Sequence, residues 1–297
     1  TEHVKVTGPL GEPVICEYGI IESTKTAVIE MAGAAGITQV PDEKRNPLYT
    51  TTYGVGEVIK DAIEKGCRRF IVGIGGSATN DGGVGMLQAL GYAFLDKDGK
   101  QVLPGARGLK DITEITDAYV IPELAECKFR VACDVTNPLC GELGCSAIYG
   151  PQKGATPEMI QDMDQWLGAY AELAKERFPK ADPVYPGTGA AGGMGFAFLT
   201  FTDAVLESGI NIVLDETKLE DYIKDADLVI TGEGRMDGQT AMGKAPVGVA
   251  KLAKKYGKKV IAFAGAVQRD ARACNDAGID AFFPILRGVV TLEEAMK

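Results

Sequence analysis

Histidine is nearly absent from this chain: among its 297 residues the only one is His3, close to the N-terminus. Histidine is the usual general acid or base near neutral pH and the commonest metal ligand. Its scarcity argues strongly against histidine-based catalysis and against a histidine-rich metal site. A single histidine near a terminus is more often a surface residue than a ligand.

Cysteine is present but never in the C-x-x-C spacing of redox or zinc motifs. The seven cysteines are an odd number in a chain large enough to fold without disulfides. Cys140 and Cys145 form a C-x4-C pair, but without a nearby histidine this is a weak indication of metal binding. We interpret the cysteines as reduced, mostly buried thiols of a cytoplasmic protein.

Long apolar runs and net positive charge are also missing. No segment approaches the about 18 to 20 apolar residues of a membrane helix, and no signal-peptide pattern occurs. The formal net charge is −10, and the one dense basic run, residues 251–259, has the pattern of a solvated helix face. We therefore expect neither a membrane nor nucleic acid as a partner.

Two standard nucleotide-binding motifs are missing as well. The phosphate-binding pattern G-x-x-x-x-G-K-[ST] does not occur. A G-x-G-x-x-G match covers residues 187–192, but a proline precedes it where the dinucleotide motif requires a strand. This disfavours an NAD-dependent dehydrogenase.

Glycine, in contrast, is abundant, with 38 residues that cluster without a fixed period. Residues 73–85, GIGGSATNDGGVG, follow the strand-like RRFIV and precede a helical pattern. Bare amides at such a turn form an anion site. The candidate binding residues here are Gly75, Gly76, Ser77, Thr79 and Asn80, with Asp81 as a candidate catalytic carboxylate. The alternative is a tight structural turn in which Asn80 and Asp81 cap the next helix.

Strand and helix patterns alternate along the chain, which predicts an α/β protein with mostly parallel sheets. Residues 2–21 predict two strands around a turn, and the spacing predicts helices over 51–67 and 156–178, the latter with Thr156 as N-cap. Residues 25–32 fit a strand or a helix start equally well. We expect ligands beyond the carboxyl ends of the strands and a domain boundary near Lys224 or Asp225.

Residues 231–246, TGEGRMDGQTAMGKAP, form a polar glycine loop fed by a buried strand. Glu233 and Asp237 could hold Mg²⁺, while Arg235 and Lys244 could stabilise charge on a transferring phosphoryl group. Gly232 and Gly234 would supply bare amides. The alternative is a solvated loop with internal salt bridges.

Two further stretches carry candidate binding residues. In CDVTNPL, Asp134 could act as a base toward a substrate hydroxyl, and Asn137 lies beside it. The alternative there is a turn before Pro138. In the second glycine-rich stretch, residues 186–201, the candidates are Gly189, Gly192 and Gly193.

Five of these blocks resemble the bacterial glycerate kinase type I family. The two most distinctive are IVGIGGSATNDGGVGMLQALG and ITGEGRMDGQTAMGKAP, and CDVTNPLCG, GPQKGAT and PGTGAAGGMGFA resemble further family blocks. They occur in the family's order and cover nearly the whole chain, so the resemblance is specific.

The resemblance implies ATP-dependent phosphorylation of D-glycerate, usually to 2-phosphoglycerate, with Mg²⁺. A homodimer is one possible assembly. The resemblance also implies two α/β domains, one inserted into the other, with the site in the cleft between them. Residues 1–224 would be the inserted domain, and residues 225–297 the C-terminal part of the first, Rossmann-like domain. Catalysis would fall to Asp81, Arg235, Asp237 and Lys244, and metal binding to Glu233 and Asp237.

The sequence departs from the family pattern in one respect. Family members open with a strand and a Pro-Asp-Ser-Phe-Lys stretch, followed later by Asp-Gly-Gly-Glu-Gly, and neither stretch occurs here. The rival hypothesis is therefore a catalytically incomplete fragment, or a module that binds a phosphorylated or carboxylate small molecule.

Overall fold

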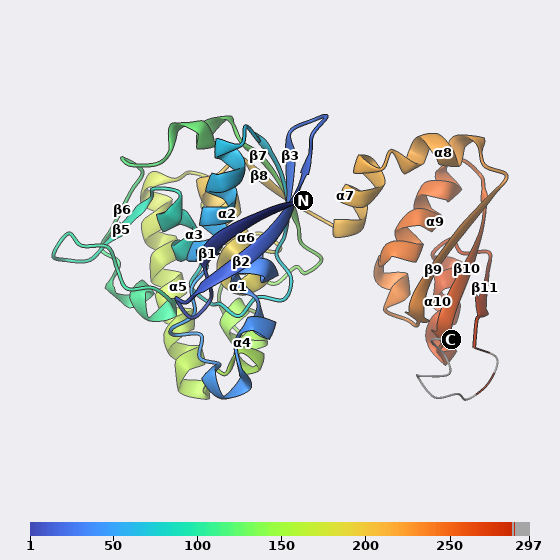
Figure 1. The fold of residues 1–297 in the computed structure, drawn as a ribbon. Coiled ribbons are helices and arrows are strands. Elements are labelled where there is room, and N and C mark those ends of the chain that lie inside the picture. Colours follow the sequence, from blue (N-terminus) through green and yellow to red (C-terminus); the bar gives the residue numbers. More distant parts are fainter. Residues whose placement is uncertain (287, 289–297) are drawn as a thin grey trace. The chain divides into compact units, whose positions relative to one another are not determined.

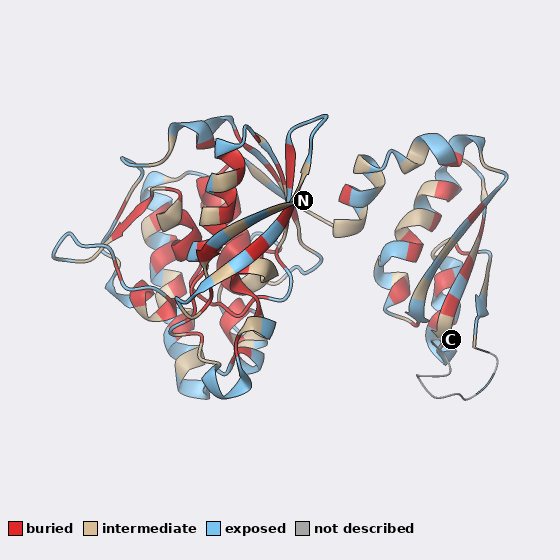
Figure 2. Cartoon of the chain, in the orientation of Figure 1, coloured by how far each residue is buried: buried red, intermediate tan, exposed pale blue. Residues whose placement is uncertain are grey.

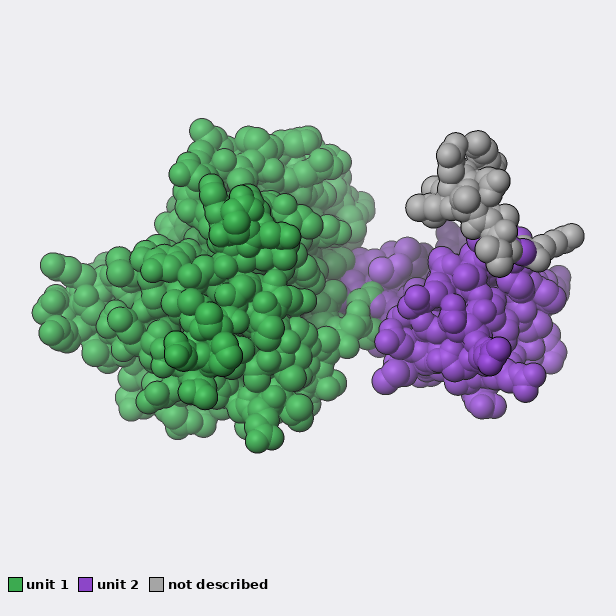
Figure 3. Space-filling view, turned by 90° about the horizontal axis from the view of Figure 1, so that it is seen from below, with its two compact units in different colours: residues 1–209 green, residues 210–297 purple. Residues whose placement is uncertain are grey.

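The computed structural model describes residues 1–286 and residue 288. It divides the chain into two compact units, residues 1–209 (unit 1) and residues 210–297 (unit 2), which Figure 3 distinguishes by colour. This division precedes the boundary expected near Lys224 or Asp225, because α8 (Leu219–Asp225) packs on α9 (Ala245–Lys255) and Ile210 of α7 (Gly209–Glu216) lies against Gly248 of α9. Ile223 of α8, for example, is buried in the unit 2 core. The insertion of one domain into the other stays a prediction.

A six-stranded sheet forms the centre of unit 1 (Figure 1). Its strands lie in the order β1 (Glu2–Thr7), β2 (Pro13–Ile21), β3 (Thr26–Glu30), β4 (Arg69–Gly73), β7 (Lys128–Ala132) and β8 (Ala204–Glu207). The predicted hairpin over residues 2–21 is confirmed as the antiparallel pair β1 and β2. The strands from β3 to β8 run parallel, and β5 (Ala93–Leu95) pairs with β6 (Glu114–Thr116) in a separate antiparallel ribbon. The predicted α/β class with mostly parallel sheets is therefore confirmed.

The helices of unit 1 are α1 (Ala32–Ala35), α2 (Tyr53–Glu64), α3 (Val84–Ala89), α4 (Cys145–Tyr149), α5 (Pro157–Arg177) and α6 (Ala190–Phe201). Two of them, α2 and α5, lie within the ranges 51–67 and 156–178 that the sequence predicts as helices. Short 3₁₀ turns connect the helices: η1 (Ile37–Gln39), η2 (Asp42–Lys44), η3 (Ala106–Asp111), η4 (Pro122–Glu126) and η5 (Pro151–Lys153). The predicted cap is confirmed, because the Thr156 hydroxyl accepts a hydrogen bond from the Met159 amide at 3.3 Å.

The core of unit 1 is built on the parallel strands. Phe70 of β4 stacks on Phe129 of β7 with ring centroids 4.7 Å apart, and Phe198 of α6 packs against Phe129. All three rings are buried, as Figure 2 shows for the centre of this unit. Burying aromatic and aliphatic side chains on the sheet fixes β4 and β7 side by side, so their carboxyl ends meet at one edge.

Unit 2 contains a three-stranded parallel sheet in the order β11-β10-β9. The strands are β9 (Leu228–Met236), β10 (Lys259–Val267) and β11 (Ala281–Pro284), and α9 (Ala245–Lys255), α10 (Ala273–Asp276) and the turns η6 (Thr240–Met242) and η7 (Arg269–Arg272) connect them. Helix α9 packs on β9 and β10. On the opposite face, Phe263 pairs with Phe283 and Ile230 pairs with Ile261, and Ile230, Phe263 and Phe283 are 61%, 40% and 48% exposed.

Strand β9 is longer than the sequence predicts. The glycine loop expected from Thr231 begins only after Met236, because residues 231–236 stay paired with β10. Glu233 and Arg235 therefore lie on a strand, where residues two apart project from the same face. This corrects the expectation that both residues belong to a loop.

The sequence predicts neither membrane helices nor disulfides. Among the described helices, none combines the length and the apolar character needed to cross a membrane. The seven cysteines are free thiols and five of them are buried, which confirms the interpretation as mostly buried thiols.

Candidate functional site

Unit 1 contains a pocket of about 500 Å³ beyond the carboxyl ends of β4 and β7. This is where parallel α/β sheets bind their ligands. The lining residues come from the ends of both strands and from the segments around them: Ile37, Gly73, Ile74, Gly75, Gly76, Ser77, Ala132, Cys133, Asp134, Val135, Tyr149, Gln152, Lys153, Ala190 and Ala191. Of the candidate residues from the sequence, the pocket brings together Gly75, Gly76, Ser77 and Asp134.

The glycine loop on the pocket wall is held by hydrogen bonds from several elements. The Thr50 hydroxyl donates to the Ala78 carbonyl at 2.8 Å, and the Lys153 ammonium donates to the Thr79 carbonyl at 2.6 Å. Gly76 has a φ of +70°, which a side-chain-bearing residue rarely adopts. Gly75 faces open space, since a Cβ there would meet no atom within 4 Å. The loop thus presents bare backbone to the pocket in a fixed conformation.

Thr79 and Asn80 lie behind the loop rather than in the pocket wall. Both are fully buried, and the Asn80 amide donates to the Ser146 hydroxyl at 2.8 Å. Neither residue is among those that line the pocket. Their contacts are those of a scaffold that fixes the loop.

Asp81 is also buried and is fully engaged by its own surroundings. Its carboxylate accepts hydrogen bonds from the Thr52 amide at 2.8 Å, from the Thr52 hydroxyl at 2.9 Å and from the Gly83 amide at 3.1 Å. Burial raises the pKa of Asp81, while these hydrogen bonds oppose the rise. Gly83 precedes α3, so this geometry matches the alternative in which Asp81 secures the start of the helix. Its catalytic role stays a prediction.

Asn137 links two segments beside the pocket. Its amide donates to the Leu143 carbonyl at 2.8 Å, and its side-chain oxygen accepts from the Tyr149 hydroxyl at 2.6 Å. Both ends of the side chain are thus occupied by protein groups. Asn137 positions Tyr149, which does line the pocket.

Gly189, Gly192 and Gly193 allow close packing of backbones. A Cβ on Gly189 would lie 2.1 Å from the Pro138 carbonyl oxygen, and one on Gly192 would lie 2.1 Å from the Thr79 carbonyl oxygen. A Cβ on Gly193 would lie 2.7 Å from the Cα of Gly82. Gly192 and Gly193 thus bring the start of α6 against the glycine loop, and Gly189 brings it against Pro138.

Lys153 is the functional candidate that sequence reasoning missed. It lines the pocket although only 2% of it is exposed, and burial lowers its pKa to about 8. Lysine is mostly exposed in proteins, so no local pattern predicts that this one is buried. The available signal was its place in GPQKGAT, a lysine enclosed by a glycine- and proline-rich turn.

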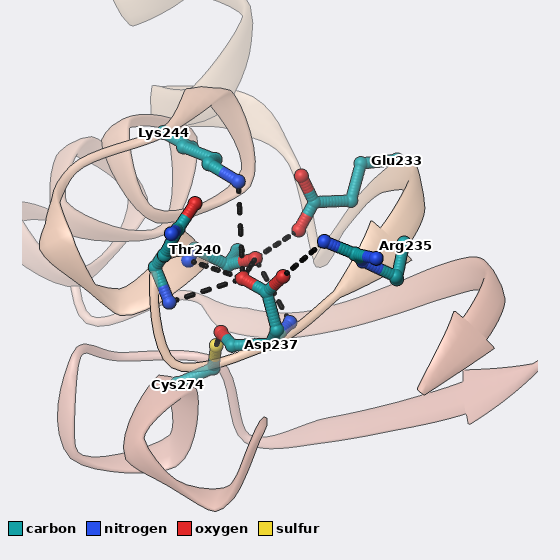
Figure 4. A network of polar contacts seen from close by, with 7 residues as sticks. Glu233, Arg235, Asp237, Thr240, Lys244 and Cys274 are labelled. Carbon is teal, nitrogen blue, oxygen red and sulfur yellow. Dashed lines mark hydrogen bonds and ion pairs between the residues drawn. The ribbon is translucent and has the colours of Figure 1, made fainter. Parts of the chain in front are cut away.

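A second polar cluster lies in unit 2, at the end of β9 (Figure 4). The Asp237 carboxylate accepts from the amides of Gln239 at 3.0 Å and Thr240 at 3.2 Å. Arg235 approaches it to 3.2 Å and Lys244 to 3.8 Å. The structure thus brings together Arg235, Asp237 and Lys244, as the sequence predicts.

Asp237 is the anionic centre of this cluster. Burial opposes its ionisation, but the Thr240 amide, Lys244, Arg235 and the Gln239 amide outweigh burial and lower the pKa of Asp237. The carboxylate is therefore ionised at neutral pH and holds both cations on one side of the strand end.

Thr240 joins Glu233 to this cluster and was not foreseen. Its buried hydroxyl donates to one carboxylate oxygen of Glu233 and accepts from the Asp237 amide at 3.1 Å. The second carboxylate oxygen of Glu233 forms no hydrogen bond with any described residue.

The donor set of the cluster can be tested against Mg²⁺. Among the described residues, no group of three or more histidine, cysteine, aspartate or glutamate side chains could enclose a metal. Mg²⁺ is commonly held by one or two carboxylates together with substrate phosphates and waters. Glu233 fits that arrangement. Asp237 fits it less well because its oxygens already serve two amides and two cations.

Gly232 and Gly234, the predicted amide donors, lie within β9. A Cβ on Gly232 would lie 2.4 Å from the Phe263 carbonyl oxygen, so packing against β10 explains this glycine. A Cβ on Gly234 would meet no atom within 4 Å, which leaves its backbone open to a ligand.

A glycine loop at strand ends, a buried lysine, and carboxylates beside paired cations are typical of enzymes that transfer phosphoryl groups. Comparison with known proteins points to the same class of enzyme. The model of the glycerate kinase family matches residues 1–297. Glycerate kinase of Haemophilus influenzae is 52% identical over 293 residues, which are 99% of this chain and 78% of that protein.

Two further relatives give the same result. Glycerate 2-kinase of Escherichia coli is 50% identical over 295 residues, 99% of this chain and 77% of that protein. A crystal structure from Salmonella typhimurium LT2, described provisionally as glycerate kinase 2, is 48% identical, has a TM-score of 0.90 and covers 99% of this chain and 77% of that one. The chain belongs to the glycerate kinase family and is a kinase.

Proposed function

We propose that the chain transfers the γ-phosphoryl group of ATP to the C2 hydroxyl of D-glycerate and releases 2-phosphoglycerate and ADP. The hydroxyl oxygen forms a bond to the γ-phosphorus, the bond from that phosphorus to the β,γ-bridging oxygen breaks, and the hydroxyl proton passes to a base. Membership of the glycerate kinase family supports the reaction, and the name of the E. coli relative supports the position.

The observation that carries the proposal is the pocket at the ends of β4 and β7. Asp134 lines this pocket. One of its carboxylate oxygens accepts a hydrogen bond from the Gly209 amide at 3.1 Å, and the other has no hydrogen bond among the described residues. We assign Asp134 as the base that takes the hydroxyl proton. Ser77 and the backbone of Gly75 and Gly76 offer hydrogen bonds to the substrate.

The polar cluster at the end of β9, formed by Glu233, Arg235, Asp237, Thr240 and Lys244, would supply the groups that phosphoryl transfer needs. Arg235 and Lys244 would neutralise charge on the transferring group, and Asp237 orients both. Glu233 would hold Mg²⁺ with its free carboxylate oxygen, and the ion when bound would neutralise charge on the ATP phosphates.

The test is a coupled assay of ADP release with D-glycerate, ATP and Mg²⁺, followed by ³¹P NMR of the product. A phosphate on C2 couples to one proton and gives a doublet, whereas a phosphate on C3 couples to two protons and gives a triplet. We expect glycerate-dependent ADP release and a doublet. A triplet would contradict the position, and binding of D-glycerate without ADP release would favour the binding-module hypothesis.

The setting of this reaction follows from its substrates. We propose that the enzyme works in the cytoplasm, where ATP is available and where its seven free thiols stay reduced. A homodimer remains a prediction, which sedimentation equilibrium would test.

A further inference from the structure

Lys153 places an ammonium group inside the protein without an ion pair among the described residues. An ammonium has three N–H donors, and the one acceptor found for Lys153 is the Thr79 carbonyl oxygen at 2.6 Å. Among the described residues, no carboxylate forms an ion pair with it. Asp81 is near enough to act electrostatically, but its oxygens are held by Thr52 and Gly83. A buried charge in this state is costly unless an anion joins it.

The pocket wall indicates what kind of anion fits. Its charged lining residues are Lys153 and Asp134, so the charges of the wall sum to zero. A triphosphate usually needs several cations or a metal ion beside it. A wall with a single lysine suits a small monoanion, and Asp134, which lines the same pocket, suits a hydroxyl donor on the same molecule.

We propose that Lys153 binds the carboxylate of the hydroxy-acid substrate and so selects glycerate over uncharged polyols. This assignment rests on the proposed function of the pocket. The carboxylate completes the hydrogen bonding of the ammonium, and the adjacent C2 hydroxyl is the group that Asp134 can reach.

The test compares three variants in the full chain: Lys153→Met, Lys153→Arg, and Lys60→Met as a matched control on the exposed face of α2. We expect Lys153→Met to raise the KM for D-glycerate about 100-fold, because a buried charge pair is lost. The KM for ATP should stay unchanged, and the preference for D-glycerate over glycerol should collapse. The KM of Lys153→Arg for D-glycerate should lie between the values for the parent protein and for Lys153→Met. Lys60→Met should have the kinetic constants of the parent protein.

Other outcomes overturn the assignment. An increased KM for ATP with an unchanged KM for D-glycerate would place a nucleotide phosphate on Lys153. A lower kcat with both KM values unchanged would make Lys153 a support for the glycine loop alone.

A calorimetric titration of the unmodified protein with D-glycerate keeps the proposal testable if Lys153→Met fails to fold. The free pKa of Lys153 is about 8, so affinity should fall about tenfold for each pH unit above that value. Of the neighbouring groups, Cys145 has its pKa raised to about 11 by burial, and burial also raises the pKa of Asp81, while hydrogen bonds from Thr52 and Gly83 oppose that rise. Asp134 is the other charged residue of the pocket wall. Constant affinity from pH 7 to 10 would overturn the proposal. Absence of turnover with intact, pH-dependent binding would contradict the proposed reaction but not the role of Lys153.

Discussion

At the scale of single residues, the glycines of this chain do two different things. Gly75 and Gly234 leave backbone open where a Cβ would meet nothing within 4 Å. Gly192 and Gly193 instead let the start of α6 touch the glycine loop, and both have positive φ. Gly192 and Gly193 therefore help to position the pocket wall, although neither lines the pocket.

We predict that Gly192→Ala destabilises unit 1 by more than about 3 kcal/mol, because the new methyl group would meet the Thr79 carbonyl oxygen at 2.1 Å. Gly66→Ala is the matched control, since Gly66 also has positive φ but open space around it, and it should cost about 1 kcal/mol. Urea unfolding followed by fluorescence of Trp166, the single tryptophan, measures both. Equal effects of the two substitutions would show that φ alone, and not packing, requires Gly192.

At the scale of elements, the chemistry of unit 2 depends on where β9 ends. The strand carries Glu233 and Arg235 on one face, and the turn after Met236 places Asp237 and Thr240 beside them. Lys244 precedes α9 and reaches the same carboxylate. Strand, turn and helix start thus assemble the cluster from twelve consecutive residues, Glu233 to Lys244.

We predict that Arg235→Ala and Asp237→Asn each reduce turnover about 100-fold, because each removes charge that acts on the transferring phosphoryl group, directly or by orienting the cations. Lys251→Ala, on the exposed face of α9, should leave turnover unchanged. Steady-state ADP release measures all three. Turnover near that of the parent protein in both cluster variants would remove the cluster from the mechanism.

At the scale of the whole molecule, the two units have separate cores of very different size. The core of unit 1 includes residues of β1, β2, β3, β4 and β7 and of the helices, whereas the smaller core of unit 2 lies on one face of a three-stranded sheet. Parallel sheets are usually covered on both faces. Among the described residues, the other face of the unit 2 sheet exposes Ile230, Phe263 and Phe283, and the insertion of one domain into the other stays a prediction.

We predict that unit 2 unfolds before unit 1, because it buries less apolar surface. Trp166 lies on α5 in unit 1, so its fluorescence reports that unit alone, while far-UV circular dichroism reports both. A urea titration should show an early dichroism transition that fluorescence does not follow. Coincident transitions by the two probes would mean that the units unfold as one cooperative system.

The sequence by itself determined the α/β class, most helices and strands, the glycine loop and the family, because periodicity, capping residues and motif order are local properties. It also predicted the grouping of Arg235, Asp237 and Lys244, which lie close along the chain. Only the tertiary structure decided that β9 runs through Met236, because pairing with β10 holds residues that local glycines would release. Burial of Lys153 against the Thr79 carbonyl was likewise decided by tertiary contact, since segments 74 residues apart meet there and no local pattern records that meeting.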